Sequence, residues 1–486
     1  MQFYRYLRHR FLFILLCFVN SGCKKFLDVG SPITDITSFS AFAEDKTATA
    51  VMTSTYFTMM GPNFQGPNGI NSFSVVCGLA SDEFTYISNS PNKTLQLFYQ
   101  NNLNSTIGSY WSALYKTIAT CNRMVEGLTI STSLSPSVNK QLLAEAKFLR
   151  AFSFFYLANL YGDVPLVLTT DYKIISSMER TPVIQVYEQI IRDLKEAQQG
   201  LSEDFLDGNL QKYSGAAERI RPTKWAATAL LARVYLYNRD WVNAETEASK
   251  LIASSLFNLS LLNNAFLKSS LGNMEAIWQL QPIDVGYNTK DGYTFIIPST
   301  GPTNDQPVKI SEELLNSFEN GDLRRNANWI DSITVGGSSY YYPFKYKVNR
   351  SPSVTVATGA TPMTEFLNVF RLSEQYLIRA EARAQQNNVD GSQDDLNIIR
   401  NRAGLPNAAA SDKDSLLSSI LRERQVEFFA EWGHRWFDLK RIGKLDIVMP
   451  AISTAKGGSW ESTDKFFPIP VSEIDLNHHL IQNEGY

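Results

Sequence analysis

The segment from Ala144 to Val167, AEAKFLRAFSFFYLANLYGDVPLV, contains a predicted helix that constrains the fold of this chain more than any other feature. Its apolar residues form two adjacent rows at helical spacing: Leu149, Phe152, Tyr156 and Leu160 in one row, and Phe148, Ala151 and Phe155 in the other. A helix with two apolar rows must be covered on most of its surface, so other helices have to pack around it. Gly162 and Pro165 supply its end.

Further amphipathic segments follow the same spacing. They are WSALYKTIATCNRMVEGL at 111–128, VYEQIIRDLKEAQQGL at 186–201, and TKWAATALLARVYLYNRDWVNAETEASKLI at 223–252, which breaks tightly at Asn238 to Asp240. The two runs of the last segment match the spacing of the tetratricopeptide repeat, in which small residues let two antiparallel helices approach closely. The matching positions are Leu231, Ala232, Tyr235, Ala244, Ala248 and Leu251.

A single repeat of this kind cannot bury its own apolar face, so several degenerate repeats must stack, and we expect roughly four helix pairs. A similar pair is predicted at 371–386 and 392–404, although its register against the repeat pattern is poor. The chain is therefore predicted to be mostly α: a tetratricopeptide-like helical-repeat scaffold with long irregular loops and short β segments.

The sequence changes in character between about Leu259 and Thr364. Gly, Pro, Asn, Ser and Tyr crowd together at 284–307 and 335–353, short β-like runs such as AIWQLQ occur, and no helical period is sustained. Long loops of this kind are usually functional or disordered, and the aromatic content argues against disorder. We therefore predict a loop-rich insertion at about 259–364 within a single domain that spans residues 23–486.

The first residues of the chain have the pattern of an export signal. Arg5, Arg8 and Arg10 precede an unbroken apolar run from Phe11 to Val19. This run has the length of a signal-peptide core rather than of a membrane span.

Cys23 is the predicted lipidation site. Ser21 and Gly22 stand directly before it, an arrangement that resembles the lipobox of bacterial lipoproteins, in which the cysteine is acylated and becomes the first mature residue. Asn20 occupies a position where leucine is usual. The alternative is an ordinary signal peptide with an incidental cysteine. We predict a lipoprotein signal peptide at residues 1–22.

Composition excludes some classes of partner. A net charge of -3 with 19% charged residues provides no basic field for nucleic acid. From Val29 onward no apolar run is long enough to cross a bilayer, so we expect a water-soluble body held at a membrane by its lipid. Cys77 and Cys121 are the cysteines left to pair, and they fit two buried thiols equally well.

No catalytic signature is found in the sequence. It contains no H-E-x-x-H, C-x-x-C, P-loop or G-x-S-x-G motif and only four His. Asp82 and Glu83 are adjacent and point in different directions, so a solvated loop or helix cap is expected there rather than a catalytic pair. His478 and His479 lack partners at ligand spacing and are expected at the surface. We predict no catalytic residue, no metal site and no cofactor.

A stripe of alternating charge lies near the C-terminus, in ERQVEFFAEWGHRWFDLKRIG at 423–443. Its members follow at steps of three and four, which places them on one face of a helix: Arg424, Glu427, Glu431, Arg435 and Asp438. These charges should neutralise one another and leave no free acid or base. Gly433 within the pattern indicates a close helix contact or a break.

Nine blocks of the sequence, in this order, resemble the SusD/RagB family of Bacteroidetes outer-membrane lipoproteins. They are KKFLD behind the lipobox, SDEFTY, WSALYKTIATCNRMVE, EAKFLRAFSFFYLANLYGDVPLV, RPTKWAATALLARVYLY, YLIRAEARAQ, LNIIRNRAGL, ERQVEFFAEWGHRWFDLKRIG and FFPIPVSEIDLNHHLIQNEGY. The likeness runs from Cys23 to Tyr486 and is weakest at 259–364. Where the family commonly has E-G-x-R, this chain has Glu431-Trp-Gly-His-Arg435, with an added tryptophan.

The resemblance implies a tetratricopeptide-like helical scaffold and a non-enzymatic role. It implies a location on the outer membrane, facing the cell exterior. It also implies a partner, a SusC-like TonB-dependent outer-membrane barrel over which the lipoprotein acts as a lid. Ligands in the family are mostly oligosaccharides, and peptides in some branches.

We predict that the ligand binds on the aromatic loops. A sugar ring stacks its apolar face on Trp or Tyr, and its hydroxyls need nearby polar groups. The candidates lie in Gly/Asn/Pro-rich sequence outside any helical period, where side chains are expected to face solvent. The stacking candidates are Tyr86, Tyr287, Tyr293, Trp329 and Tyr341, and the polar candidates are Asn63, Asn288 and Asp291.

Three other functions remain open at this point. One is a peptide-binding lipoprotein of the RagB type. Another is an exported glycan-degrading enzyme, which needs a paired acid and base across an open cleft. The last is a structural repeat scaffold that recognises a protein with its concave face.

Cys23→Ala tests the lipid attachment. The variant should lose fatty-acid labelling and leave the membrane fraction, because the acylated thiol is gone. Unchanged labelling and fractionation of the variant would show that Cys23 is incidental.

Overall fold

The computed structural model describes residues 41–61, 69–87, 92–284, 288–326, 328–348 and 363–486. Most of its ordered elements are helices, as predicted. The scaffold helices are α3 (Asp45–Met60), α7 (Ser109–Ile130), α8 (Pro136–Tyr161), α10 (Val183–Gly200), α11 (Lys224–Tyr237), α12 (Trp241–Ile252), α15 (Leu372–Gln385), α16 (Val389–Arg402) and α17 (Lys413–Phe428).

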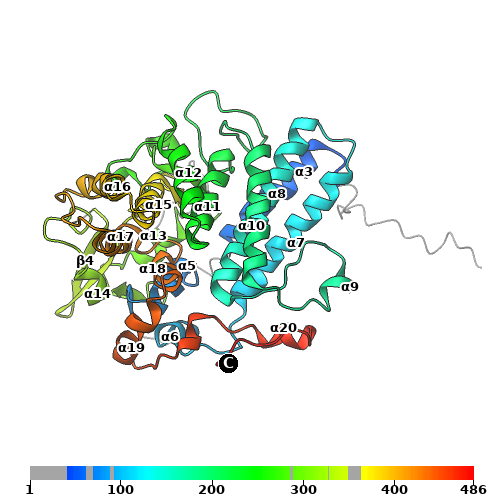
Figure 1. Cartoon of the computed structure of the whole chain (residues 1–486). Coiled ribbons are helices and arrows are strands. Elements are labelled where there is room, and N and C mark those ends of the chain that lie inside the picture. The colour runs from blue at the N-terminus through cyan, green and yellow to red at the C-terminus, as the bar shows by residue number, and fades with distance from the viewer. Residues whose placement is uncertain (1–40, 62–68, 88–91, 285–287, 327, 349–362) are drawn as a thin grey trace, which may run out of the picture.

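These helices form an array in which each packs against the next. Helix α8 contacts both α7 and α10, α11 joins α10 to α12, and α15 joins α12 to α16 and α17. Helix α3 packs against α7 and α8. Figure 1 shows the array running from α7 at one side of the molecule to α16 at the other. The prediction of a mostly α scaffold built from stacked helix pairs is confirmed.

Helix α8 lies at the centre of the apolar core. Both of its predicted apolar rows are buried, and its aromatic side chains meet rings from other elements. The Tyr156 ring stacks on Phe73 with centroids 4.7 Å apart, and Phe148 contacts Trp278 edge to face at 5.1 Å. Gly162 ends the helix with a φ of 77°, a conformation that glycine adopts at little cost.

The helix pair α11–α12 follows the predicted repeat spacing. Leu231, Ala232, Ala244, Ala248 and Leu251 are fully buried, and the short break between the helices contains Arg239 with a φ of 59°. Small residues at the contact let the two helices approach closely. The second predicted pair is present as α15 and α16, and α15 packs directly against α12.

The stretch from Leu259 to Thr364 is more regular than predicted. Its elements are η3 (Leu262–Asn264), η4 (Ser269–Leu271), β2 (Ala276–Leu280), α13 (Lys290–Phe295), β3 (Val308–Ile310), α14 (Glu312–Leu315), β4 (Ile330–Val335) and β5 (Ser338–Pro343). These elements are three to six residues long, which is too short for a sustained period to show in the sequence. The expected short β segments are present in the described part of this stretch, and short helices that the sequence did not predict lie between them.

The strands form three separate antiparallel pairs. Strand β2 pairs with β6 (Leu367–Arg371), β4 pairs with β5 as a hairpin, and β1 (Phe84–Tyr86) pairs with β3. The remaining elements are α5 (Phe73–Ala80), α6 (Lys93–Tyr99), α9 (Tyr172–Ile175), α18 (His434–Arg441), α19 (Leu445–Ala455), η5 (Ser462–Lys465) and α20 (Val471–Leu476). The β1–β3 pair connects two segments that are more than 200 residues apart in the sequence: Phe84 on β1 lies opposite Ile310 on β3.

The charged stripe near the C-terminus does not lie on one helix. Helix α17 ends at Phe428 and α18 begins at His434, with Gly433 in the left-handed region at a φ of 75°. A Cβ at position 433 would lie 2.7 Å from the Cβ of Cys77, so the close contact with α5 requires glycine. The left-handed backbone at the break between α17 and α18 favours glycine as well. The prediction of one continuous face was wrong because periodicity alone does not reveal a break of this length.

The stripe is also buried, and most of its partners come from distant parts of the chain. The Glu427 carboxylate accepts hydrogen bonds from Arg371, Arg324 and Arg402. Glu431 pairs with Arg371 at 2.8 Å. The predicted mutual neutralisation within the stripe holds for Arg424 and Asp438, which lie 2.7 Å apart. We call Glu427, Glu431, Arg324, Arg371 and Arg402 the buried ion cluster.

Asp82 and Glu83 are buried rather than solvated. Asp82 forms a bidentate ion pair with Arg435, at 2.8 and 2.6 Å. Burial and the nearby Asp82 charge raise the pKa of Glu83 to about 8. The expected solvated loop is therefore wrong, because α18 covers this segment and supplies the counter-charge. His478 and His479 are exposed, as predicted.

Cys77 on α5 and Cys121 on α7 are buried free thiols, which settles the open question of a disulfide between them. Burial raises the pKa of both thiols.

Glu83→Gln should stabilise the protein at high pH. The pKa of Glu83 is higher in the folded than in the unfolded protein, so stability falls as pH rises from about 4.5 to about 8. Glutamine cannot ionise, so its advantage over the native residue should grow by about 2 to 3 kcal/mol between pH 6 and pH 9. Urea unfolding at both pH values measures this difference. Glu484→Gln, which changes an exposed carboxylate, is the control. An equal effect of Glu83→Gln at both pH values would contradict the prediction.

Candidate ligand-binding site

The candidate site lies where β1, β3, α6 and α13 come together. Tyr86 at the end of β1 is opposite Val308 on β3, and the next backbone amide, that of Ile87, donates to the carbonyl of Pro307 at 2.8 Å. This pairing brings the end of β1 beside the segment that precedes β3. Two loops that are far apart in the sequence therefore share one edge of the molecule.

Two tyrosine rings lie on this edge. The Tyr86 and Tyr99 rings have centroids 6.4 Å apart at an interplanar angle of 45°. The hydroxyl of Tyr86 accepts a hydrogen bond from the backbone amide of Asn92 at 2.6 Å, which fixes the ring. Both side chains are half-buried and so keep part of their surface in solvent.

A third tyrosine is tied to the segment before β3. The Tyr293 hydroxyl donates to Oδ2 of Asp305 at 2.7 Å, and Gln306 Nε2 donates to the carbonyl of Tyr293 at 2.8 Å. Helix α13 begins here because Thr289 Oγ1 accepts from the amide of Gly292 at 3.0 Å and caps the helix. Tyr293 and Asp305 are half-buried. We call Tyr86, Tyr99, Tyr293 and Asp305 the tyrosine face.

Three of the predicted ligand residues do not face solvent. Trp329 is fully buried, and its Nε1 donates to the carbonyl of Leu262 at 2.9 Å. Asn288 is buried, and its Oδ1 accepts from the amides of Thr364 at 2.8 Å and Glu365 at 3.0 Å. The expectation of solvent-facing side chains is wrong for these residues, because loop-like sequence also occurs where a loop packs onto the scaffold.

Asp291 is the third buried candidate. Its Oδ2 accepts a hydrogen bond from Ser74 Oγ at 3.2 Å, and burial raises the pKa of Asp291 to about 7. It lies on α13, whereas the sequence placed it outside any helix. Tyr341 on β5 is 38% exposed, as expected. Asn63 and Tyr287 lie outside the described residues.

The sequence prediction missed Tyr99 and Asp305. Tyr99 is the last residue of the short helix α6 and stands four residues after the apolar Leu95. This spacing predicts a core residue rather than a ligand contact. Asp305 lies in the TNDQP segment, which carries only a turn signal. Tyr99 meets the Tyr86 ring and Asp305 accepts from the Tyr293 hydroxyl through tertiary contacts that have no signal in the local sequence.

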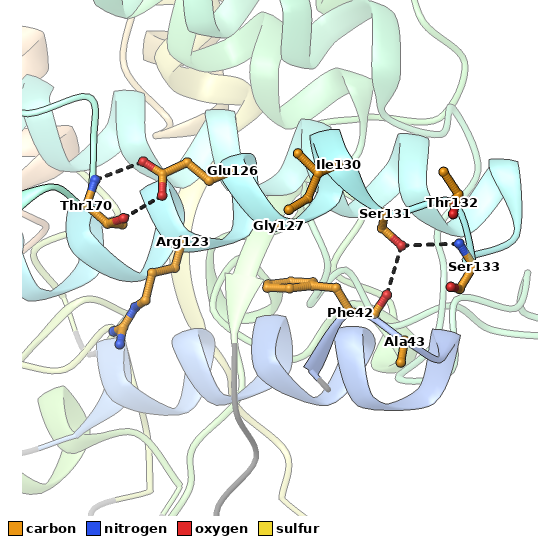
Figure 2. A pocket seen from close by; sticks show the side chains of 10 residues that line it. All are labelled: Phe42, Ala43, Arg123, Glu126, Gly127, Ile130, Ser131, Thr132, Ser133 and Thr170. Atoms are coloured by element: carbon orange, nitrogen blue, oxygen red, sulfur yellow. Dashed lines mark hydrogen bonds between the residues drawn. The ribbon is translucent and has the colours of Figure 1, made fainter. Parts of the chain in front are cut away.

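A pocket of about 430 Å³ lies elsewhere, between α7 and the residues before α3 (Figure 2). Glu126 accepts from the amide of Thr170 at 2.8 Å, and Ser131 Oγ donates to the carbonyl of Phe42 at 2.8 Å. The Phe42 ring lies against Gly127, where a Cβ would come within 2.2 Å of ring atoms. These polar groups already bond to one another and the ring is covered, so the tyrosine face is the better candidate for sugar stacking.

In the described part of the chain, no helix is long and apolar enough to cross a membrane. The same residues contain no group of three His, Cys, Asp or Glu that could hold a metal ion.

Two protein-family models match this chain, one in its N-terminal half and one in its C-terminal half. A family model described as "Starch-binding associating with outer membrane" matches residues 25–236, and one described as "SusD family" matches residues 270–486. The chain is 24% identical over 523 residues to SusD-like protein P2 from Formosa agariphila, covering 99% of this chain and 100% of that protein.

Two further proteins are similar. Starch-binding protein SusD from Bacteroides thetaiotaomicron is 26% identical over 416 residues, covering 71% of this chain and 72% of that protein. The structure of surface glycan-binding protein A from Bacteroides uniformis superposes with a TM-score of 0.73 at 21% identity, covering 90% of this chain and 99% of that one. The family models, the relatives and the helical scaffold agree, and the chain belongs to the SusD/RagB family.

Proposed function

We propose that this protein is a cell-surface glycan-binding lipoprotein that captures oligosaccharides and passes them to a SusC-like TonB-dependent outer-membrane transporter. The observation that carries the proposal is the tyrosine face, in which the partly exposed rings of Tyr86 and Tyr99 lie together and a third partly exposed tyrosine, Tyr293, donates to the carboxylate of Asp305. Aromatic rings stack on the apolar faces of sugars, and a carboxylate accepts hydrogen bonds from sugar hydroxyls.

The names of similar proteins support the ligand class. The relative from Bacteroides thetaiotaomicron is a starch-binding protein, and the similar structure from Bacteroides uniformis is a surface glycan-binding protein. The Tyr86 and Tyr293 side chains are held by hydrogen bonds to neighbouring segments, so little ordering of these rings is needed when a ligand binds.

The proposal includes the absence of glycan hydrolysis. Hydrolysis needs two carboxyl groups across an open cleft, about 5 to 9.5 Å apart. The tyrosine face includes one carboxylate, Asp305, which already accepts from the Tyr293 hydroxyl. Asp291 and Glu365 have a pKa of about 7, raised by burial in both cases, but both side chains are buried and hydrogen-bonded within the fold.

The location and the partner rest on the family and on the N-terminal sequence. The family description "associating with outer membrane" supports an outer-membrane surface. The lipobox-like Ser21-Gly22-Cys23 supports a lipid anchor on Cys23 that leaves the body facing the cell exterior. The transporter partner is proposed because the chain belongs to the family in which such a partner is expected.

Tyr86→Ala and Tyr293→Ala should each weaken glycan binding by about 1 to 2 kcal/mol, or about five- to thirtyfold, because a stacking ring is lost. The glycan is first selected from a panel of soluble oligosaccharides, and calorimetry then measures its affinity. Tyr172→Ala is the matched control, because Tyr172 lies on α9 and is 72% exposed.

Three outcomes would overturn this part of the proposal. Full affinity in the Tyr86→Ala, Tyr293→Ala double variant would place the site elsewhere. Release of reducing ends by the purified protein would favour an enzyme. Binding of peptides with no binding of glycans would favour the peptide-binding alternative.

The transporter should co-purify with the lipoprotein from outer membranes solubilised in mild detergent. A tag on the lipoprotein should retain a TonB-dependent barrel encoded by a neighbouring gene, since the two proteins are proposed to act as one unit. Cys23→Ala provides the control for membrane co-localisation. A lipoprotein that elutes alone, with no barrel gene adjacent to its own, would contradict the partnership.

A further inference from the structure

A second cavity lies outside the tyrosine face. It has a volume of about 510 Å³, within the usual range for small-molecule sites. The ends of α8, α11 and α18 and the start of α10 form its walls, and Phe466 and Asn483 from the C-terminal segment complete it. No residue of the tyrosine face lines it. We call it the α8–α18 pocket.

Lys440, at the end of α18, supplies a cation to this pocket without a carboxylate partner. Its Nζ donates to the carbonyl of Asn159 and lies 4.0 Å from the centroid of the Phe466 ring. Across the described residues, no carboxylate forms an ion pair with it. An ammonium group has three donors, so two remain for a ligand. Burial and the charge of Lys465 lower the pKa of Lys440 well below its ordinary value, and an anion beside it would restore the ammonium form.

Arg180 supplies a second cation. Its guanidinium donates to the carbonyls of Asp163, Ile481 and Tyr161, and to Oδ1 of Asn483 at 2.6 Å. These four acceptors hold it rigidly, and one of its five N–H donors remains for a ligand. In the described chain Arg180 also has no ion pair, so its charge is not neutralised by contact with a carboxylate.

The wall beside Lys440 contributes aromatic surface and one more hydroxyl. Tyr237 lies at the end of α11, and its hydroxyl has no hydrogen-bond partner among the residues that the structure describes. The guanidinium of Arg441 is 5.4 Å from the Tyr237 ring centroid, but Glu381 and Asp438 neutralise its charge. Phe466 therefore offers ring surface next to the Lys440 cation, and Tyr237, whose ring also contacts Phe155 with centroids 5.0 Å apart, adds its partly exposed side chain to the lining.

One carboxylate opposes these cations. Asp163 is exposed at the rim, and its Oδ1 accepts from the amide of Val183 at 2.8 Å, at the start of α10. The pocket has an excess of one positive charge when Lys440 is protonated, because Lys440 and Arg180 are two cations and Asp163 is one carboxylate. The start of the 18-residue helix α10 also lines the pocket and adds the positive end of its dipole.

We propose that the α8–α18 pocket binds an anionic sugar residue, with its negative group between Lys440 and Arg180 and its ring against Tyr237 and Phe466. The negative group is a carboxylate, as in a uronic acid, or a sulfate ester. Either accepts charge-assisted hydrogen bonds from a lysine and an arginine. The ligand class rests on the proposed glycan binding, whereas the site is separate from the tyrosine face.

Calorimetry on the full-length protein, purified from membranes in detergent, tests the proposal with three probes. They are methyl glucuronide, the uncharged methyl glucoside and glucose 6-sulfate. An anionic probe should bind at least about tenfold more tightly than methyl glucoside, because charge-assisted hydrogen bonds are lost in the neutral sugar. Preference for the glucuronide assigns a uronic acid, and preference for the sulfate assigns a sulfate ester. Equal affinities for all three probes would overturn the proposal.

Variants locate the binding. Lys440→Met keeps the contact with Phe466 but removes the charge, and it should weaken the anionic probe at least about tenfold. Tyr237→Phe removes only a hydroxyl and should weaken it by about fivefold, which keeps the test valid if Lys440→Met does not fold. The matched control is Lys347→Met, since Lys347 also donates to backbone carbonyls and lies 4.2 Å from a phenylalanine centroid, but outside the pocket.

The outcomes separate this proposal from the general function. Anionic binding that is unchanged in both Lys440→Met and Tyr237→Phe would overturn the second site. Two results together would support both sites independently. Neutral-glycan binding should be lost only in the tyrosine-face variants, and binding of the anionic probe should be reduced only in the pocket variants.

Discussion

The Glu427 carboxylate ties together three segments that are far apart in the sequence. It is fully buried, and it accepts hydrogen bonds from Arg371 on β6, Arg402 on α16 and Arg324 in the segment after α14. Arginine and carboxylate charges away from water are stable only when each is paired, and removing one partner leaves an uncompensated charge that costs about 3 to 5 kcal/mol. The three elements therefore cannot separate independently. The buried ion cluster sets where the last scaffold helices meet the short strands.

The tyrosine face depends on this cluster through a short chain of contacts. Glu427 lies at the end of α17, and a short turn leads from there into α18. Arg435 on α18 pairs with Asp82, two residues before β1. Ser311 Oγ then donates to the carbonyl of Asp82 at 2.5 Å, and its amide donates to the carbonyl of Glu83 at 2.9 Å, which brings β3 alongside β1. The edge on which the tyrosines lie is thus attached through these contacts to the buried core, as pre-organised binding requires.

The sequence predicted those features that repeat. The two apolar rows of α8 and the small residues of α11 and α12 recur at a fixed spacing over many residues, so the helices and their stacking could be anticipated. Trp329 and Asn288 were misplaced because their burial depends on pairing with residues tens of positions away, as with the Leu262 carbonyl that accepts from Trp329. At the candidate site, Tyr86 and Tyr293 were identified individually, but the hydrogen bond that links Tyr293 to Asp305 and the β1–β3 pairing leave no local signal.

The packing around Gly433 has a consequence for the reactivity of the Cys77 thiol. The backbone at Gly433 covers the Cys77 side chain so closely that even a methyl group would not fit between them. Thiol–disulfide exchange requires an accessible thiolate, whereas burial keeps both Cys77 and Cys121 in the thiol form at neutral pH. In the folded protein both thiols are fully buried, so neither is accessible for capture as a mixed disulfide.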